Sequence, residues 1–196
     1  MKILLLADQA EPVLWEHLDR RKLEGVELIL SCGDLPAEYL SFLTCFTEAP
    51  ILYIHGNHDD RYATNPPEGC ICIEDQIYTY GGVRILGLGG SMRYNRGINQ
   101  YTEQQMRRRV GRLRFKLWCS GGIDILLTHA PAYQLGDEAD LAHRGFETFL
   151  HVIDKYHPRF LVHGHVHQSY RHDFKRIRQR GDTQVINACG YYFLDI

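Results

Sequence analysis

The sequence lacks both the long apolar run that crosses a membrane and the excess of one charge that binds a polyanion. Among its 196 residues, no stretch approaches the roughly 20 apolar residues that span a bilayer. Its 22 basic residues are balanced by 24 acidic ones, and the formal net charge of −2 exerts no general attraction on nucleic acid or anionic lipid. The opening apolar stretch, Lys2–Ala7, is too short for the core of a signal peptide. We therefore expect a soluble, cytoplasmic protein with no membrane partner.

Paired cysteines are also missing. The chain has 6 cysteines, which form no Cys-x-x-Cys motif and lie mostly within apolar stretches. This pattern disfavours a thiolate zinc site and the disulfide framework of a small secreted domain, so we interpret the cysteines as small buried residues. Histidine, in contrast, is frequent, with 11 residues in the chain, and its placement carries most of the functional interpretation.

Short apolar runs alternate with amphipathic segments along most of the chain, which is typical of strands alternating with helices. Predicted strands are Lys2–Ala7, Val26–Ser31, Ile51–Ile54, Val83–Leu88, Ile123–Thr128 and Phe160–His163, followed by a tail of strands at Tyr170–Arg178, Thr183–Cys189 and Tyr191–Ile196. Predicted helices are Glu11–Leu23, Pro36–Phe46, Tyr101–Trp118 and His143–Tyr156. The chain contains no linker or repeat, so the pattern predicts one layered α/β domain over residues 1–196, with a mixed sheet or two packed sheets.

Residues that can bind a metal stand at the carboxyl ends of several of these predicted strands. They are Asp8, Gly33-Asp34, Gly56-Asn57-His58-Asp59, His129 and Gly164-His165-Val166-His167. In layered α/β folds, ligands gather beyond the carboxyl ends of the strands. A single Asp after a strand is most often a turn former. The coincidence of so many strand ends predicts a pocket of oxygen and nitrogen donors.

These segments, together with Thr128-His129-Ala130-Pro131, resemble the motifs of the calcineurin-like metallophosphoesterases between residues 8 and 167. The resemblance implies a four-layer αββα sandwich, in which two packed mixed β-sheets are flanked by helices and hold two divalent metal ions at one rim. The ligands that it implies, carried over position by position, are Asp34 as a bridge between the metals, Asn57, His129 and His165 for the second metal, and Asp8 and His167 for the first. Carboxylate, amide and imidazole ligands favour manganese, with iron, zinc or nickel as alternatives.

The reaction that the resemblance implies is the hydrolysis of a phosphate ester, with a phosphodiester somewhat ahead of a monoester. A metal-bridging hydroxide would attack phosphorus, and His58 would protonate the departing alkoxide as a general acid. Asp59 either orients the His58 ring or caps a helix. The glycine-rich loop Gly87–Asn95 follows a predicted strand, and its Arg93 and Tyr94 are candidates for contacts with the substrate phosphate.

One departure from the family pattern concerns the first metal site. The usual Asp-x-His reads Asp8-Gln9-Ala10 here, and alanine cannot coordinate a metal. We expect a weak or exchangeable first site, or compensation by Gln9, Glu11 or a residue from elsewhere in the chain. Adjacent residues at a strand end point in different directions, which disfavours a simple replacement by Gln9. The alternative is a non-catalytic scaffold with a degraded site, like the retromer subunit that resembles this family. The presence of His58 favours an active enzyme.

Two basic segments, Arg107–Lys116 and Arg171–Arg180, introduce a further alternative, a nuclease of the same chemistry that acts on RNA or DNA. A solvated helix face accounts for the first segment without any partner, so nucleic acid is the less favoured partner. The sequence does not specify an oligomeric state.

Overall fold

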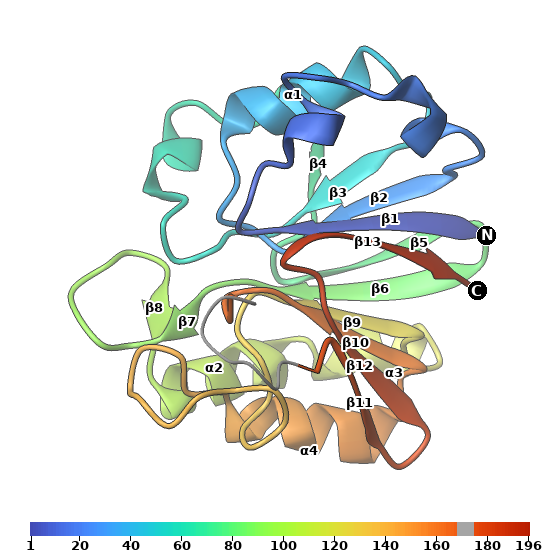
Figure 1. Ribbon diagram of the computed structural model, residues 1–196. Helices are drawn as coiled ribbons and strands as arrows, with labels where there is room; N and C mark the ends of the chain where they lie inside the picture. The colour runs from blue at the N-terminus through green and yellow to red at the C-terminus, as the bar shows by residue number, and fades with distance from the viewer. Residues whose placement is uncertain (168–174) are drawn as a thin grey trace.

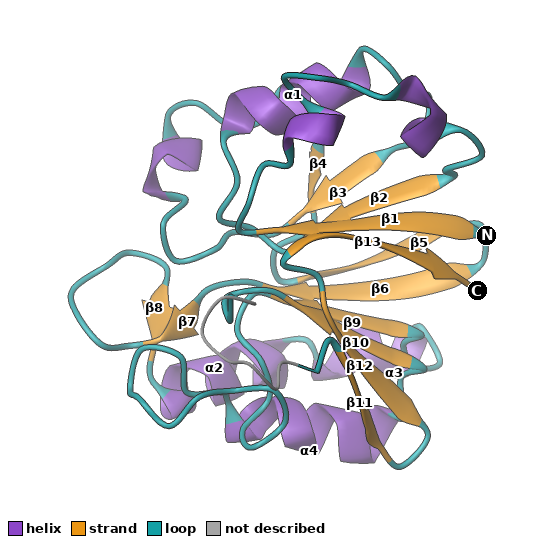
Figure 2. Cartoon of the chain, in the orientation of Figure 1, coloured by secondary structure: helices purple, strands orange, loops and turns teal. Residues whose placement is uncertain are grey.

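Two β-sheets pack face to face, and helices cover the outer face of each sheet (Figures 1 and 2). The computed structural model describes residues 1–167 and 175–196. An apolar layer that includes Leu5, Leu30, Leu127 and Val162 fills the space between the sheets. Two further apolar clusters lie beneath the helices, one on each side. The order helix, sheet, sheet, helix confirms the predicted four-layer αββα class.

The first sheet has the strand order β13-β1-β2-β3-β4. Its strands are β1 (Lys2–Ala7), β2 (Leu28–Ser31), β3 (Ile51–Tyr53), β4 (Ile71–Cys72) and β13 (Gly190–Asp195). Strands β1 to β4 are parallel neighbours, and β13 pairs with β1 in the antiparallel sense. Strands β2 and β3 are buried along their whole length and β1 along nearly all of it, which explains their unbroken apolar sequences.

The second sheet has the strand order β11-β12-β10-β9-β6-β5. Its strands are β5 (Gln76–Tyr80), β6 (Val83–Leu88), β9 (Ile125–Thr128), β10 (Phe160–His163), β11 (Ile177–Arg180) and β12 (Thr183–Asn187). The inner strands are parallel, whereas β5 and β11 are antiparallel edge strands. A separate pair, β7 (Ser91–Met92) and β8 (Gln100–Tyr101), follows β6. The carboxyl ends of the parallel strands of both sheets face the same rim, on the left of Figure 1.

The two helical layers differ in content. The first sheet is covered by α1 (Ala37–Thr44) and by three short 3₁₀ helices, η1 (Pro12–Leu14), η2 (Arg20–Leu23) and η3 (Asp60–Ala63). The second sheet is covered by α2 (Glu103–Arg112), α3 (Arg114–Cys119) and α4 (Glu147–Tyr156). Thr102 and Gln105 form the predicted capping box at the start of α2. In the ranges 1–167 and 175–196, no helix has the length and apolar character to cross a membrane.

The predicted helix over residues 11–23 is wrong, because η1 and η2 stand there, separated by turns. The Asp19 carboxylate accepts hydrogen bonds from the Arg21 backbone N–H at 3.2 Å and from the Arg21 guanidinium at 2.8 Å. Such local side-chain bonds compete with helical backbone bonds. The helix predicted over residues 101–118 is interrupted at Leu113 and continues through Gly111. Most of the strand predicted over residues 170–178 lies outside the described residues, and β11 begins at Ile177.

The cysteines differ in their surroundings more than the sequence predicts. Cys32 and Cys189 are buried, as expected for small apolar residues, whereas Cys45 and Cys119 are exposed. The six thiols are free, in agreement with the absence of a disulfide framework in the sequence.

Candidate metal centre

Three residues at the rim have left-handed backbone geometry although they are not glycine. The φ angles are 64° at Asp8, 57° at Asp34 and 67° at His165. A positive φ is uncommon for such residues, and it costs about 1–3 kcal/mol where the surrounding structure enforces it. Each residue follows closely on a buried strand, β1, β2 or β10. The chain therefore turns sharply at three strand ends where the sequence predicts ligands.

The loops after β2 and β3 are in backbone contact at this rim. A Cβ atom on Gly33 would lie 2.1 Å from the Gly56 nitrogen, and one on Gly56 would lie 2.0 Å from Asp34 Oδ1. Neither position has room for a side chain. The contact is reinforced by Asp59, whose Oδ2 accepts hydrogen bonds from the backbone N–H groups of Gly56 at 2.7 Å and Asp34 at 2.8 Å. The motif glycines and Asp59 together set the distance between two loops that carry predicted ligands.

This arrangement gives Asp59 a role that the sequence did not predict. Helix η3 begins without a side-chain hydrogen bond from Asp59, so the capping alternative is wrong. The carboxylate instead binds the backbone of the two loops. Burial, and next the charge of Asp34, raise the pKa of Asp59 to about 6.

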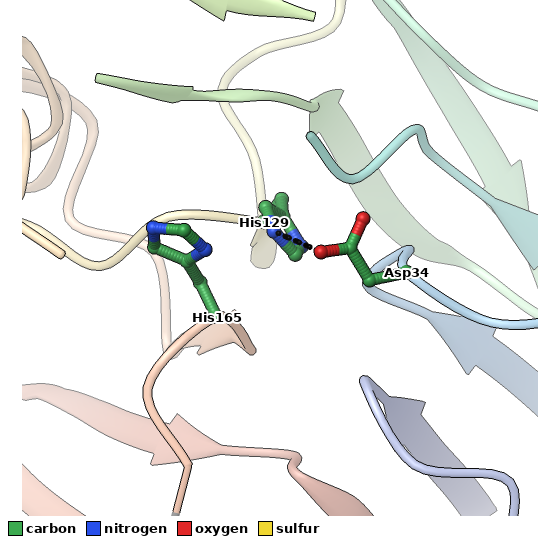
Figure 3. A group of neighbouring side chains, drawn as sticks. All are labelled: Asp34, His129 and His165. Carbon is green, nitrogen blue, oxygen red and sulfur yellow. Dashed lines mark ion pairs between the residues drawn. The ribbon is translucent and has the colours of Figure 1, made fainter. Parts of the chain in front are cut away.

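Asp34, His129 and His165 form a compact group in which one donor atom from each residue lies within 4.8 Å of the others (Figure 3). Asp34 follows β2 of the first sheet, whereas His129 and His165 follow β9 and β10 of the second. His129 is fully buried, and the centroids of the two imidazole rings are 4.8 Å apart. The two sheets together therefore supply one group of mixed oxygen and nitrogen donors.

Several acceptor atoms converge beside the His129 ring. Its Nε2 lies 2.9 Å from Asn57 Oδ1 and 3.3 Å from Asp34 Oδ2. Its Nδ1 lies 2.8 Å from the carbonyl oxygen of Cys32, which can only accept, so Nδ1 carries a hydrogen. In the neutral ring, the lone pair of Nε2 then points toward an amide oxygen and a carboxylate oxygen. A positive charge at this point satisfies all three atoms, and a metal ion fits this donor set.

The electrostatics of the group also favour a cation. Burial lowers the pKa of His129, but the carboxylates of Asp34 and Asp8 outweigh burial and raise it to about 9. Burial raises the pKa of Asp34, yet the charge and hydrogen bond of His129 outweigh burial and lower it to about 2. The carboxylates therefore favour a positive charge at His129 in spite of its desolvation, and a divalent cation bound by these residues would take the place of the proton on Nε2.

His165 presents an unprotonated nitrogen to the same group. Its Nε2 lies 2.7 Å from the Ala142 carbonyl oxygen and so carries the hydrogen. Burial, and next the charge of His129, lower the His165 pKa to about 3. The ring is therefore neutral at pH 7, and Nδ1 keeps its lone pair on the edge that faces His129 and Asp34 (Figure 3). Carbonyl partners of this kind fix the tautomer of metal-binding histidines.

The predicted ligands of the first site lie beside this group. Both carboxylate oxygens of Asp8 accept the His165 backbone N–H, at 3.0 and 2.9 Å. His167 Nδ1 lies 3.4 Å from Gln9 Nε2. Strand alternation predicts that Gln9 points away from Asp8, but the structure places its amide against a predicted first-site ligand. Because the residue at the strand end has a positive φ, simple alternation does not extend beyond β1.

Ala10, which stands where the family pattern has a histidine, lines a cavity of about 620 Å³ together with Asp34 and His58. The His58 backbone N–H donates to Asp34 Oδ1 at 2.7 Å, which fixes His58 relative to the predicted bridging ligand. The carboxylate of Glu11 lies against Gly190 instead, where a Cβ atom would approach it to 2.5 Å. Of the two neighbours that the sequence offers in place of the missing imidazole, Gln9 is the one beside a predicted ligand.

The loop after β6 brings one of the two predicted substrate residues to the site. The Tyr94 hydroxyl accepts a hydrogen bond from Asn57 Nδ2 at 3.2 Å. Arg93 is exposed, and its guanidinium donates to the Gln100 carbonyl oxygen at 3.2 Å. The buried side-chain oxygen of Gln100 accepts the backbone N–H groups of Tyr94 at 3.2 Å and Asn95 at 3.0 Å, and so holds the loop in place.

His143 was missed as a neighbour of the site. The sequence predicts it as the first residue of a helix, but it lies in the loop before α4. Its ring centroid is 5.1 Å from that of His165, and its Nδ1 is 3.0 Å from the Asp140 carboxylate. The Asp-x-x-His spacing in a polar loop, apart from the other motifs, is the only signal that the sequence offers for this residue.

Comparisons with known proteins agree with this geometry. The family profile described as calcineurin-like phosphoesterase matches residues 5–169. No curated protein sequence matches the chain. One crystal structure is similar with a TM-score of 0.71 at 15% identity, and the match covers 99% of this chain and 94% of that chain.

Two further solved structures share the fold. The protein TT1561 of Thermus thermophilus is 15% identical, with a TM-score of 0.62 over 96% of this chain and 89% of its own. GAP50, the anchor in the inner membrane complex of Plasmodium, is 14% identical, with a TM-score of 0.56 over 95% of this chain and 70% of its own. At such low identities, the likeness concerns the fold alone.

Proposed function

The chain belongs to the calcineurin-like phosphoesterase family, and we propose that it hydrolyses a phosphate ester with the help of divalent metal ions, a phosphodiester ahead of a monoester. The observation that carries this proposal is the convergence of Asn57 Oδ1, Asp34 Oδ2 and His129 Nε2. When Nε2 is unprotonated, these three acceptors share one point that a metal ion would satisfy, and both sheets of the sandwich are needed to bring them together.

In the proposed second metal site, Asp34, Asn57, His129 and His165 would hold one ion. A divalent ion bound there acts as a Lewis acid toward a phosphoryl oxygen and lowers the pKa of a bound water. Manganese is the first candidate, and iron, zinc and nickel accept the same mixture of donors. The hydrogen bonds from the two histidines to backbone carbonyls keep the ligating nitrogens turned toward Asp34.

In the proposed first site, Asp8 and His167 would hold the other ion, with Asp34 as a shared ligand. This site is the weaker one, because Ala10 supplies no ligand. Gln9 is the proposed substitute ligand: its Nε2 lies 3.4 Å from His167 Nδ1, and the oxygen of the same amide is a suitable ligand for a divalent cation.

His58 is the proposed general acid. It lines the same cavity as Asp34 and Ala10, so the leaving group of an ester bound to the metals would lie in this cavity. A proton donated by a positioned side chain accelerates such a reaction by roughly 10²–10⁴-fold. Asp59 is proposed to support catalysis indirectly, through the hydrogen bonds that hold the loop of His58 against Asp34.

Tyr94 and Arg93 are the proposed substrate contacts. The Tyr94 hydroxyl accepts from Asn57 and keeps its own hydrogen, which it can donate to a phosphoryl oxygen. The exposed Arg93 donates to a single backbone carbonyl, which leaves further guanidinium donors for the substrate.

The nuclease alternative finds no support in the first basic segment. Arg109 is buried and bound to two carboxylates. Arg107 and Arg114 line a groove of about 260 Å³ between α2 and α4, whereas Asp34 and His58 line the cavity at the rim. The second basic segment begins among residues that lie outside the described part of the chain.

The proposal is tested with metal-free protein to which Mn²⁺ is returned. We expect hydrolysis of bis(4-nitrophenyl) phosphate and, more slowly, of 4-nitrophenyl phosphate. His58→Ala should lower kcat by about 10²-fold or more while Mn²⁺ binding persists. His151→Ala, which removes an exposed imidazole on α4, is the matched control and should change neither. Full activity of the His58→Ala protein, or an absence of Mn²⁺ binding by the wild type, would contradict the proposal.

A further inference from the structure

We propose that Glu74 is a positioning residue of the metal centre, which holds the loop after β3 and the loop after β6 in register. This inference rests on the proposed function. Glu74 lies in the segment between β4 and β5, where the chain passes from the first sheet to the second (Figure 1). The loop after β3 carries Asn57 and His58, and the loop after β6 carries Tyr94. Neither the family motifs nor the basic segments of the sequence include Glu74.

The two carboxylate oxygens of Glu74 bind the two different loops. Its Oε2 accepts the backbone N–H of His55 at 3.1 Å and lies 3.2 Å from the Nδ1 of the same residue. Its Oε1 accepts the backbone N–H of Gly89 at 2.8 Å and a hydrogen bond from the Arg109 guanidinium. One carboxylate therefore fixes the beginning of both loops.

The two loops are in direct contact at this point. A Cβ atom on Gly89 would lie 2.3 Å from the His55 carbonyl oxygen and 2.5 Å from Glu74 Oε2, so only glycine fits. The Gly90 N–H donates to the same His55 oxygen at 2.8 Å. Further along, the loops meet again where Asn57 donates to the Tyr94 hydroxyl. A shift at the first contact would therefore move the Asn57 amide relative to its metal.

Arg109 is the counterion that keeps this carboxylate charged. Its side chain is only 8% exposed, and it donates to Glu74, to the Gly89 carbonyl oxygen at 2.8 Å and to Asp75 Oδ1 at 2.9 Å. Its guanidinium also lies 4.4 Å from the centroid of the Tyr101 ring. Burial raises the pKa of Glu74, but the His55 hydrogen bond and the Arg109 charge outweigh burial and lower it. A buried carboxylate of this kind needs such a partner.

Asp75 offers a matched control, because it binds the same arginine from the solvent side. Its side chain is 44% exposed, and its φ of 53° is one that asparagine tolerates well. The variants Asp75→Asn and Glu74→Gln each remove one of the negative charges that contact Arg109. Only Glu74→Gln also places an amide NH₂ against groups that already donate. In one orientation of the amide this group is His55, and in the other orientation the groups are Gly89 and Arg109.

The experiment measures Mn²⁺ affinity by titration of metal-free protein, kcat/KM for bis(4-nitrophenyl) phosphate, and hydrogen exchange at the His55 and Gly89 amides without metal. Glu74→Gln should weaken Mn²⁺ binding by about 10–100-fold, lower kcat/KM by a similar factor and speed exchange at both amides. Asp75→Asn should match the wild type in all three. If Glu74→Gln does not fold, Arg109→Lys, which retains the charge but loses the fork of donors, should show a smaller change of the same kind.

A Glu74→Gln protein that matches Asp75→Asn in metal affinity and amide exchange would overturn the inference and leave the proposed function intact. A wild-type protein that neither binds Mn²⁺ nor hydrolyses the diester would overturn the proposed function and this inference with it. The two failures differ, because the second is seen before any variant is compared.

Discussion

Asn57 Oδ1 lies 2.9 Å from His129 Nε2, and these two atoms belong to loops of opposite sheets. The same amide donates to the Tyr94 hydroxyl at 3.2 Å, so its nitrogen is turned to the tyrosine and its oxygen to the histidine. Asn57 is therefore the residue through which the loop after β3 engages the second sheet twice, once at a proposed ligand and once at a proposed substrate contact.

Replacement of Asn57 by Ala should weaken Mn²⁺ binding by at least about tenfold, because it removes a proposed ligand oxygen and releases Tyr94. Titration calorimetry of the metal-free protein measures the change. Asn65→Ala is the control, since Asn65 lines the same cavity and its amide contacts Glu38 at 3.4 Å. Equal affinities of the two variants would exclude Asn57 as a ligand.

Replacement of Ala10 by His should raise the number of Mn²⁺ ions that the protein retains through dialysis, because the imidazole would enter the cavity beside Asp34. Ala10→Leu adds a side chain of similar size without a nitrogen and should not raise retention. Made in the wild-type background, Gln9→Ala should lower the number of retained Mn²⁺ ions below the wild-type value if the Gln9 amide binds the ion of the first site. Metal analysis that finds the same content in the His and Leu variants would mean that another residue already fills this position.

The two glycines Gly56 and Gly111 should respond to alanine in opposite directions. A Cβ atom at Gly56 would lie 2.0 Å from Asp34 Oδ1, so Gly56→Ala should lower the free energy of unfolding by about 1–3 kcal/mol and abolish tight Mn²⁺ binding. At Gly111, inside α2, nothing lies within 4 Å of the added atom, and the change should stabilise the protein by up to about 1 kcal/mol. Urea unfolding of both variants measures the difference, and a stable, metal-binding Gly56→Ala protein would contradict the close approach of the loops.

Metal-free protein should lose stability as the pH falls below about 6.5, in part through His163. This side chain is 1% exposed, and burial lowers its pKa to about 4. The pKa of histidine in an unfolded chain is about 6.5. Between about pH 4 and pH 6.5, His163 is therefore protonated in the unfolded state but not in the folded state. The contribution is fully present above about pH 6.5 and is lost by about pH 4, and it amounts to about 3 kcal/mol.

His163→Gln, which cannot titrate, should make the unfolding free energy less dependent on pH in this window. Urea unfolding at several pH values, with a chelator present, gives the two slopes. Other buried groups, His165 among them, contribute equally to both proteins, so the difference between the slopes isolates His163. Parallel curves would show that His163 titrates alike in both states.

The strand ends were predictable because apolar runs and the residues that follow them are both local features of the sequence. Asp8, Asp34 and His165 stand where the sequence places them, directly beyond buried strands. The ring orientations were not predictable, because the partners that set them are the backbone carbonyls of Cys32 and Ala142. Every residue has such a carbonyl, so no sequence pattern marks the ones that accept from a histidine.

Arg109 shows a second limit of the sequence. Within a run of basic residues on an amphipathic helix it is interpreted as part of a solvated face, and for its neighbours Arg107 and Arg108, which are exposed, this holds. Its burial depends on a carboxylate 35 residues earlier in the chain, a separation at which charge patterns carry no information. The wrong helix prediction over residues 11–23 has a local cause instead of a distant one. There the hydrogen bonds of Asp19 to Arg21 compete with the helix that apolar spacing alone predicts.

The division of the site between two sheets links the proposed metal centre to the interior of the sandwich. Asp34 follows a strand of one sheet, and the imidazoles of His129 and His165 follow strands of the other, so their separation depends on how the apolar layer between the sheets is packed. Truncation of Leu30 or Leu127 in that layer lets the sheets settle closer or slide by a fraction of an ångström. The protein would then lose bound metal ion before it unfolds. Metal occupancy at the rim would therefore depend on side-chain packing between the sheets, at a distance from the site.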